Sequence, residues 1–339
     1  MNSDKSKAKT QDDVQLAETI NKAFRTIKQE LSRVIIGQDD IIEQLLISLF
    51  ARGHCLLIGV PGLAKTLLIR TLGDILDLKF SRIQFTPDLM PSDITGTEIL
   101  EEDRSTGQKA FKFIQGPIFA NIILADEINR TPPKTQSALL EAMQEYRVTA
   151  AGQSFKLDQP FFVLATQNPI EQEGTYPLPE AQLDRFMFSL WLDYPSYEQE
   201  VEIVKQTTVD MNLSLKPVLS KKDIIEFQNL IRRVPVAENV IDYTVKLVSA
   251  SRSGSKGVDD KINEWIGWGA GPRASQYLIL GAKVRSILHN RYTPEIEDID
   301  YLALPVLRHR IAPSYSAEAE GIDVKHIVNY ISNKIIKKG

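Results

Sequence analysis

The sequence predicts an α/β protein in which helices flank a parallel sheet and an all-helical domain follows. Short apolar runs alternate with helical patterns between about residues 34 and 193, and several of these runs lack polar alternation. Such alternation is typical of parallel sheets whose strands are buried on both faces. Strand-like runs become scarce after Pro195. We therefore predict a polar, helical extension over residues 1–30, an α/β core over residues 31–195 and a helical domain over residues 196–339.

Five apolar runs supply the strands of the predicted sheet. They are Cys55–Ile58, Phe80–Gln84, Asn121–Ala125, Phe161–Thr166 and Met187–Leu192. Two helices are predicted between them, over Lys65–Leu76 and Pro132–Tyr146. The second has Thr131 as its cap and a proline in its first turn, which is typical of a helix start.

Two short hairpins are predicted as insertions in the core. Glu98–Leu100 and Phe111–Ile114 flank the polar turn Glu101–Lys109. Arg147–Thr149 and Phe155–Leu157 flank a second turn that contains a glycine. Connections of this kind lie on the surface and often carry function.

Capping motifs predict helices in the domain that follows. Ser196 with Gln199 has the spacing of a capping box, and Ser220 with Asp223 gives a weaker cap signal. Apolar residues recur beyond both caps at helical intervals, which supports the all-helical prediction.

Composition excludes several classes of protein. The 339 residues are 43% hydrophobic and 25% charged, as in ordinary globular chains. The net charge of −4 gives no global positive field, which argues against nucleic acid as a partner. The most apolar stretch, Ile41–Val60, is too polar to span a bilayer, and the polar N-terminus lacks a secretory signal. With Cys55 as the lone cysteine, in an apolar run, we expect a buried thiol and a cytoplasmic protein.

The strongest motif lies between the first predicted strand and its helix. It reads Gly59, Val60, Pro61, Gly62, Leu63, Ala64, Lys65 and Thr66. Glycines let backbone N–H groups turn toward anionic oxygens, and the helix adds its positive end. In such a loop Lys65 meets the terminal phosphates and the Thr66 hydroxyl holds Mg²⁺. Ala64 stands where the strict pattern has glycine. The motif predicts a nucleoside triphosphate site.

Polar side chains end the next two buried strands. Asp126 and Glu127 follow an apolar run, so Asp126 is expected near Mg²⁺ and Glu127 as the group that polarises an attacking water. Asn168 ends the following run and could orient that water or contact the γ-phosphate. An Asx turn before Pro169 is the alternative role for Asn168. A solvated strand end is the alternative for the acidic pair.

Two arginines complete the candidate set. Arg185 follows a short helical stretch seventeen residues after Asn168, and Arg273 stands in the first turn of a helix in the helical domain. A lone arginine is usually a surface charge. Spacing alone therefore assigns neither residue a role.

With these residues in view, the chain resembles an AAA+ ATPase, and within that superfamily the MoxR family. The matching stretches are Gly59–Thr66 (GVPGLAKT), Arg82–Gly96 (RIQFTPDLMPSDITG), Leu124–Arg130 (LADEINR), Ala165–Pro169 (ATQNP), Glu180–Phe186 (EAQLDRF) and Leu307–Ile311 (LRHRI). The match runs from about Val34 to Ile311, with the motifs in the family's order. Ala64 departs from the general phosphate-loop pattern but not from that of MoxR proteins.

The resemblance implies a P-loop NTPase core of the AAA+ type and an all-helical lid, with ATP between them. Gly59–Thr66 would be Walker A, and the pair Asp126 and Glu127 would be Walker B. Asn168 would be sensor 1. Arg185 would be the arginine finger that acts on the neighbouring subunit, and Arg273 would be sensor 2.

The resemblance also implies ligands and partners. The nucleotide would contact Ile36 and Gly37 at the adenine, the whole loop Gly59–Thr66 with Leu67, and Arg273. ATP and Mg²⁺ would be the cofactors, with Thr66 and Asp126 as metal ligands. The family implies a homo-oligomeric ring, typically a hexamer, and a protein client, in some members together with a partner that has a von Willebrand factor A domain.

Three functions are compatible with these observations. The first is a magnesium-dependent ATPase that remodels or matures a protein partner. The second is a DNA-dependent motor, because similar hairpins occur in replicative helicases; the negative net charge argues against it. The third is a nucleotide-gated scaffold without productive hydrolysis. Glu127 and Arg185 argue against the scaffold, since a pure binder needs neither.

Overall fold

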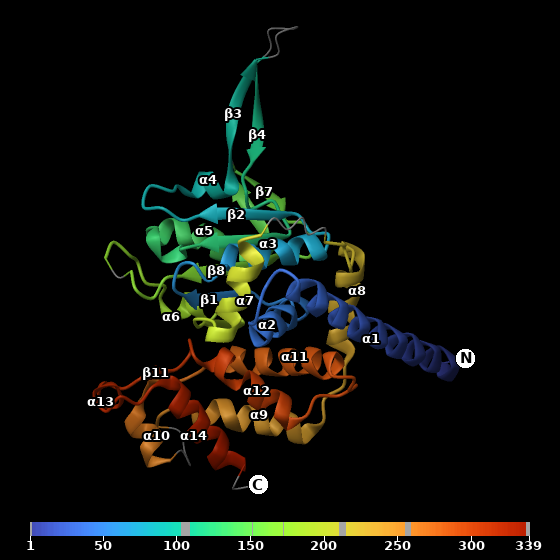
Figure 1. Ribbon diagram of the computed structural model, residues 1–339, viewed down its shortest axis with the longest axis vertical. Coiled ribbons are helices and arrows are strands. Elements are labelled where there is room, and N and C mark those ends of the chain that lie inside the picture. The colour runs from blue at the N-terminus through green and yellow to red at the C-terminus, as the bar shows by residue number, and fades with distance from the viewer. Residues whose placement is uncertain are drawn as a thin grey trace.

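A five-stranded parallel sheet forms the centre of the α/β part of the chain (Figure 1). The computed structural model describes residues 2–102, 109–150, 152–171, 173–209, 215–254 and 259–336. The strands of the sheet are β1 (Cys55–Gly59), β2 (Phe80–Gln84), β5 (Ile122–Asp126), β8 (Phe162–Gln167) and β9 (Phe188–Leu192), in the order β2-β5-β8-β1-β9. Their ends differ from the predicted runs by no more than one residue. The predicted fold class is confirmed.

The inner strands are largely apolar because each face of the sheet covers its own core, whereas the edge strand β2 carries Ser81, Arg82 and Gln84. Ile122 and Leu124 of β5 pack into one cluster of buried residues, whereas Ile123 and Ala125 pack into the other. Successive side chains of a strand point to opposite faces, so a strand covered on both sides has few polar positions.

Helices cover both faces and connect the strands. They are α2 (Asp39–Phe50), α3 (Lys65–Ile75), α4 (Pro91–Thr95), α5 (Pro133–Glu145) and α6 (Glu180–Leu183), with a short 3₁₀ turn η1 (Ile128–Arg130) after β5. Side chains of α2 and α3 enter the first cluster, and those of α5 enter the second. The crossover connections of the parallel sheet are therefore made by helices.

The segment after β9 is almost entirely helical in the part that the structure describes. Its helices are α7 (Tyr197–Thr207), α8 (Lys221–Arg233), α9 (Glu238–Ala250), α10 (Asp260–Trp265), α11 (Pro272–Leu288), α12 (Ile296–Leu307), α13 (Tyr315–Ala319) and α14 (Val324–Ile336). Both capping boxes form, at Ser196 with Gln199 and at Ser220 with Asp223. A small antiparallel pair, β10 (Ile266–Trp268) with β11 (Ala312–Pro313), departs from the all-helical prediction for this segment.

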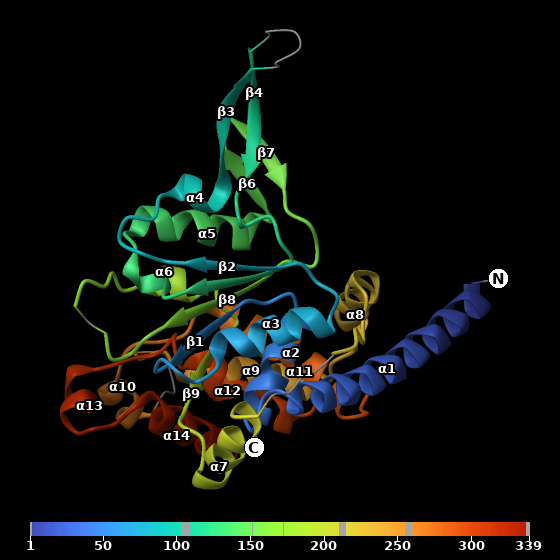
Figure 2. The ribbon, with the colours of Figure 1, turned by 45° about the horizontal axis from the view of Figure 1, so that its top comes forward.

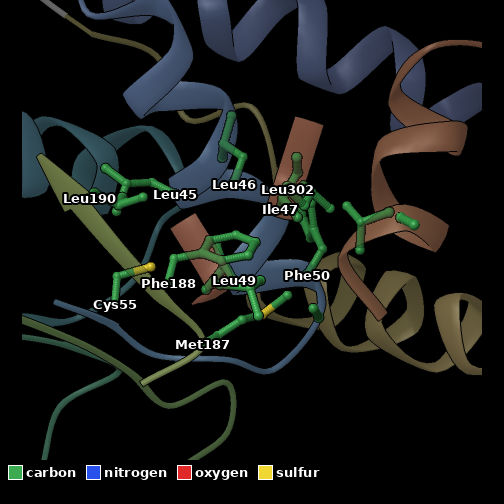
Figure 3. Packing of buried hydrophobic residues seen from close by; sticks show 14 of the residues in the cluster. Leu45, Leu46, Ile47, Leu49, Phe50, Cys55, Met187, Phe188, Leu190 and Leu302 are labelled. Carbon is green, nitrogen blue, oxygen red and sulfur yellow. The ribbon is translucent and has the colours of Figure 1, made fainter. Parts of the chain in front are cut away.

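The helical segment shares one core with the sheet. Figure 3 shows Leu302 of α12 packed near Phe188 of β9 and Leu46 of α2. Gly281 of α11 lies so close that an added Cβ would be 2.7 Å from the Leu302 side chain and 3.1 Å from that of Met187. This close packing holds the start of β9 against α11 and α12, which matters for the site below.

The N-terminal helix α1 (Asn2–Ser32) includes the extension expected over residues 1–30. Its second half is amphipathic: Ile20, Ile27 and Leu31 are buried in the first cluster. The Asn21 amide donates to the carbonyl of Ile287 in α11 over 3.3 Å. Figure 2 shows this half of α1 beside α2, α3 and α11. The extension is therefore part of the packed structure from about its midpoint onward.

Both predicted hairpins are present. The first, β3 (Gly96–Glu102) with β4 (Lys109–Gln115), is longer than predicted and projects from the body (Figure 1). Residues 103–108 of its predicted turn lie outside the described residues. The second is β6 (Arg147–Ala150) with β7 (Gln153–Lys156). Phe113 and Phe155 stack between the hairpins, with ring centroids 4.3 Å apart.

Gly96 sets the base of the first hairpin. Its φ of +99° is strained for any residue with a side chain, and a Cβ there would be 2.2 Å from the Ile114 carbonyl oxygen. We expect Gly96→Ala to lower the free energy of unfolding by about 1–3 kcal/mol. Chemical denaturation measures this. Gly271→Ala is the matched control because its φ is −79° and no atom lies within 4 Å of its Cβ position. Equal effects of the two changes would contradict the prediction.

Candidate functional site

The phosphate-loop motif connects β1 to α3 at the carboxyl end of the sheet. Gly62 and Ala64 both have positive φ, at +87° and +54°. A left-handed conformation is strained for alanine, which explains why the general pattern has glycine at this position. A Cβ at Gly59 would be 2.9 Å from the Leu192 side chain, so the start of the loop has no room for one. The loop therefore has the tight curvature that a phosphate cradle needs.

Lys65 lies within this loop and near both predicted carboxylates. Its Nζ donates to the Gly59 carbonyl over 2.7 Å. Partial burial lowers the pKa of Lys65, and the negative charges of Asp126 and Glu127 oppose that shift. The structure thus brings three of the predicted site residues to one edge of the sheet. Thr66 is half-buried in the first turn of α3, and Leu67 is exposed beside it.

Asp126 ends β5 in a network of hydrogen bonds. Its Oδ1 accepts from the Thr166 hydroxyl over 2.6 Å, and its Oδ2 accepts from Arg82 over 2.6 Å and 3.1 Å. Each carboxylate oxygen offers about two acceptor positions, so Oδ1 keeps one for a further partner while Arg82 occupies both positions of Oδ2. Thr166 also accepts from the Glu127 backbone N–H, which ties β8 to the end of β5.

Glu127 follows β5 in a left-handed backbone conformation, with φ +58°. Its Oε2 accepts from Gln84 over 3.1 Å and from Arg130 over 3.0 Å. Sequence analysis assigned no role to Arg82, Gln84 or Arg130. The signal for the first two is the place of β2 beside β5, where Gln84 pairs in register with Asp126.

The donor set fits Mg²⁺ bound together with a nucleotide. Mg²⁺ is usually held by one or two protein oxygens plus phosphate oxygens and water. Thr66 and Asp126 supply a hydroxyl and a carboxylate of this kind. Among the described residues, no group of three or more His, Cys, Asp or Glu side chains could hold a metal by itself.

Asn168 is buried just after the end of β8. Its Oδ1 accepts from the Ile170 backbone N–H over 3.1 Å, which is the Asx turn considered as its alternative role. The turn uses only the amide oxygen of Asn168, and its Nδ2 hydrogens take no part in it. The turn and a contact to nucleotide or water are therefore compatible.

The two arginines lie at the boundary with the helical segment. Arg185 donates to the Leu140 carbonyl of α5 over 2.8 Å and lines a cavity of about 280 Å³ with residues of that helix. No hydrogen bond of the described residues joins it to Lys65 or Glu127. Arg273 donates to the Asp184 carboxylate over 2.7 Å. The structure thus places Arg273 beside the residue that precedes Arg185.

Ile36 and Gly37 precede α2, and Gly37 lies against the start of the helical segment. A Cβ at Gly37 would be 2.6 Å from Nε2 of Gln199 in α7, so the side chain of Gln199 covers this glycine. Gly37 therefore lies beside α7, which connects the sheet to the later helices. Gln199 was identified from sequence only as a capping residue.

Comparison with known proteins identifies the family. A model of the ATPase family associated with various cellular activities (AAA) matches residues 54–188, and one of the AAA lid domain matches residues 261–331. The chain is 43% identical to Chaperone MoxR1 of Mycobacterium tuberculosis over 89% of its own length and 79% of that protein. It belongs to the MoxR family of AAA+ ATPases. This confirms the resemblance found in the sequence, and we call residues 261–331 the lid.

Other relatives are also similar to this chain over most of its length. The uncharacterized protein YeaC of Bacillus subtilis is 42% identical over 91% of the chain and 92% of its own. Protein MoxR of Methylorubrum extorquens is 28% identical over 85% and 87%. A crystal structure from Cytophaga hutchinsonii, provisionally described as an ATPase, has a TM-score of 0.88 and 43% identity, with 97% of this chain and 98% of that one covered. Within the described ranges, no helix has the length and apolarity needed to cross a bilayer.

Proposed function

We propose that this MoxR-family protein is a magnesium-dependent ATPase that remodels or matures protein partners. The observation that carries the proposal is the convergence of Lys65, Asp126 and Glu127 at the carboxyl edge of the sheet, next to a tightly curved phosphate loop. Ligands of open α/β sheets bind at this edge. The chaperone name of a 43% identical relative favours a protein client.

Each residue has a distinct part in the proposed hydrolysis. Glu127 orients and polarises the attacking water, because Gln84 and Arg130 fix its carboxylate at the strand end. Lys65 holds the terminal phosphates, and Asn168 offers its amide donors to water or γ-phosphate. Mg²⁺, held by Thr66 and Asp126, supplies positive charge that offsets the charge developing on the phosphate oxygens.

Two further arginines complete the site in this proposal. Arg185 acts on the nucleotide of a neighbouring subunit, so turnover requires assembly into a homo-oligomeric ring, for which we propose a hexamer. Arg273, at the start of α11, contacts the nucleotide and reports its state to the lid. Ile36 and Gly37 line the adenine pocket, and Leu67 contacts the nucleotide next to the phosphate loop.

A cytoplasmic setting and a client complete the proposal. The client is a protein. In one form of this proposal, a partner that carries a von Willebrand factor A domain acts together with the ATPase on that client. Exposed apolar side chains on the projecting hairpin support contact with a polypeptide: Leu100 and Phe111 are paired in register and are 55% and 73% exposed. Apolar side chains at such exposed positions are typical of interaction sites when they form a patch.

Steady-state phosphate release tests the enzymatic part of the proposal. We expect Mg²⁺-dependent ATP hydrolysis by the assembled protein, and loss of both ATP binding and hydrolysis in Lys65→Ala, since this ammonium compensates the phosphate charge. Lys222→Ala is the control because its side chain is 85% exposed on α8. Absence of ATP binding by the unaltered protein would overturn the proposal.

Adding single- or double-stranded DNA to the same assay distinguishes the proposed function from a DNA-dependent motor. The proposal expects turnover to change little, given the net charge of −4. Strong stimulation that weakens with added salt would favour the motor. ATP binding without measurable turnover, under conditions where rings form, would instead favour the nucleotide-gated scaffold.

A further inference from the structure

A cavity of about 470 Å³ lies between the second hairpin, β6–β7, and helix α8. We call it the hairpin–α8 cavity. Its apolar lining comes from Tyr146, Leu157 and Ile225, and its polar lining includes Arg52 and Gln159. None of the lining residues belongs to the predicted nucleotide site. The size of the cavity is that of pockets that bind small molecules.

Arg52, which follows α2, brings an unpaired positive charge to this cavity. Its Nε donates to Gln228 over 3.1 Å, and its Nη2 donates to Asn229 over 2.7 Å. Both acceptors are neutral side-chain amides of α8. Within the part of the chain that the structure describes, Arg52 forms no ion pair. A guanidinium in this state can still make charge-assisted hydrogen bonds to an anion.

The other charged residues leave the lining positive. Glu145, the carboxylate of the lining, pairs with Arg147 over 3.1 Å. Asp158, which stands between two lining residues, pairs with Lys221 over 2.9 Å. Lys156 also lines the cavity and forms no ion pair with a described residue. The cavity therefore keeps a positive charge that these carboxylates do not offset.

Tyr146 adds an aromatic surface close to the cations. Burial raises the pKa of its hydroxyl, and the positive charges of Arg52 and Arg232 oppose that shift. Arg232 of α8 is thus a further cation near the ring. Tyr146 and Arg52 have φ of +52° and +59°. Residues with side chains are strained in this left-handed conformation, and such strain is concentrated at ligand sites.

Gln159 supplies a hydrogen-bond donor that has no partner. Its Nε2 is buried and forms no hydrogen bond to any group that the structure describes. A buried donor without a partner costs free energy, and an acceptor brought by a ligand would remove that cost. Positive charge, an unused donor and an apolar wall therefore meet in one cavity.

We propose that the hairpin–α8 cavity is a binding site for a small organic anion, a carboxylate or phosphate carried on an apolar or aromatic group. The anion contacts Arg52 and Lys156 and accepts from Gln159. The apolar group lies against Tyr146 and Ile225. The inference goes beyond the proposed function, because the site uses none of the residues assigned to ATP hydrolysis.

Four probes test the chemistry of the site by isothermal titration calorimetry. They are 3-phenylpropionate and phenyl phosphate as the two kinds of anion, 3-phenylpropanol as the neutral form and inorganic phosphate as the anion without an apolar group. At least one aromatic anion should bind about ten-fold more tightly than the alcohol, since hydrogen bonds to charged groups are stronger than neutral ones. It should exceed inorganic phosphate by a similar factor, because the apolar contact is lost there. The tighter of the two aromatic anions identifies the acidic group.

Variants place the binding in the hairpin–α8 cavity. Gln159→Glu keeps the shape of the side chain but replaces the unused donor by a carboxylate, and Arg52→Gln removes a cation. Each should weaken binding of the aromatic anion by about ten-fold or more. Lys222→Gln is the matched control, because this lysine of α8 is 85% exposed and is not part of the lining. Lys65→Ala should leave the affinity unchanged. If Arg52→Gln does not fold, Gln159→Glu decides.

The contrary outcomes are equally specific. No binding of either aromatic anion, or equal binding of the alcohol, would overturn the inference. Loss of binding in Lys65→Ala but not in Gln159→Glu would place the probe in the phosphate loop and would overturn it too. These titrations contain no ATP, so a failure of the proposed ATPase activity is seen separately, in phosphate release by the unaltered protein.

Discussion

Glu127→Gln should retain ATP binding and reduce steady-state turnover by about 10²–10⁴-fold, the usual contribution of a general base. The amide has the same shape as the carboxylate and can still accept a hydrogen bond from Gln84, which lies 3.1 Å away in the unaltered protein. It cannot take a proton from water. Binding is kept because the phosphate loop and Lys65 are unchanged. Phosphate release and equilibrium binding of a fluorescent ATP analogue measure the two properties.

Glu171→Gln provides a matched control for this change. Glu171 also faces Arg130, at 3.8 Å, but it is 46% exposed and does not stand at the end of a buried strand. It should therefore leave turnover within about two-fold of the unaltered protein, as surface changes usually do. Turnover of unaltered rate in Glu127→Gln, or equal losses in the two variants, would remove Glu127 from the mechanism.

The position of Glu127 was predictable from sequence, whereas its surroundings were not. An apolar run that ends in two carboxylates identifies a strand end locally, and the observed β5 begins and ends one residue later than predicted. Which strand lies beside it depends on packing between distant segments. Gln84 and Arg82 reach the acidic pair only because β2 is the neighbour of β5, and no pattern within either run specifies that order.

The same distinction applies at the lid. The capping signals located the helices after Pro195 because caps are local hydrogen bonds, and both boxes form as predicted. The pairing of Asp184 with Arg273 and Arg310 spans 89 and 126 positions of the chain. The polar composition of the N-terminal residues likewise hid the apolar face of α1, where Ile27 is fully buried. Sequence therefore predicts elements and their ends, while contacts between elements require the fold.

Arg185→Ala should retain ATP binding and lower turnover by about 10³–10⁵-fold, the range for an arginine supplied to a phosphoryl-transfer site. Among the described residues of its own subunit, the Arg185 side chain donates one hydrogen bond, to the neutral carbonyl of Leu140. Its loss should cost about 0.5–1.5 kcal/mol of stability, so the variant is expected to fold. The large effect on rate then comes from the neighbouring site. Arg185→Lys should be nearly as inactive, since lysine lacks the planar fork.

Mixing of subunits tests whether Arg185 acts in trans. Arg185→Ala subunits keep Glu127, and Glu127→Gln subunits keep Arg185, so each is inactive alone but a mixed interface regains one complete site. Turnover should therefore appear on mixing. The control partner carries both Arg185→Ala and Glu127→Gln; it can join the ring but has no guanidinium to supply, so it should give no rescue. Failure of the single variants to complement in rings verified as mixed would place Arg185 in its own subunit's site or outside the reaction, and turnover would then not require a neighbour.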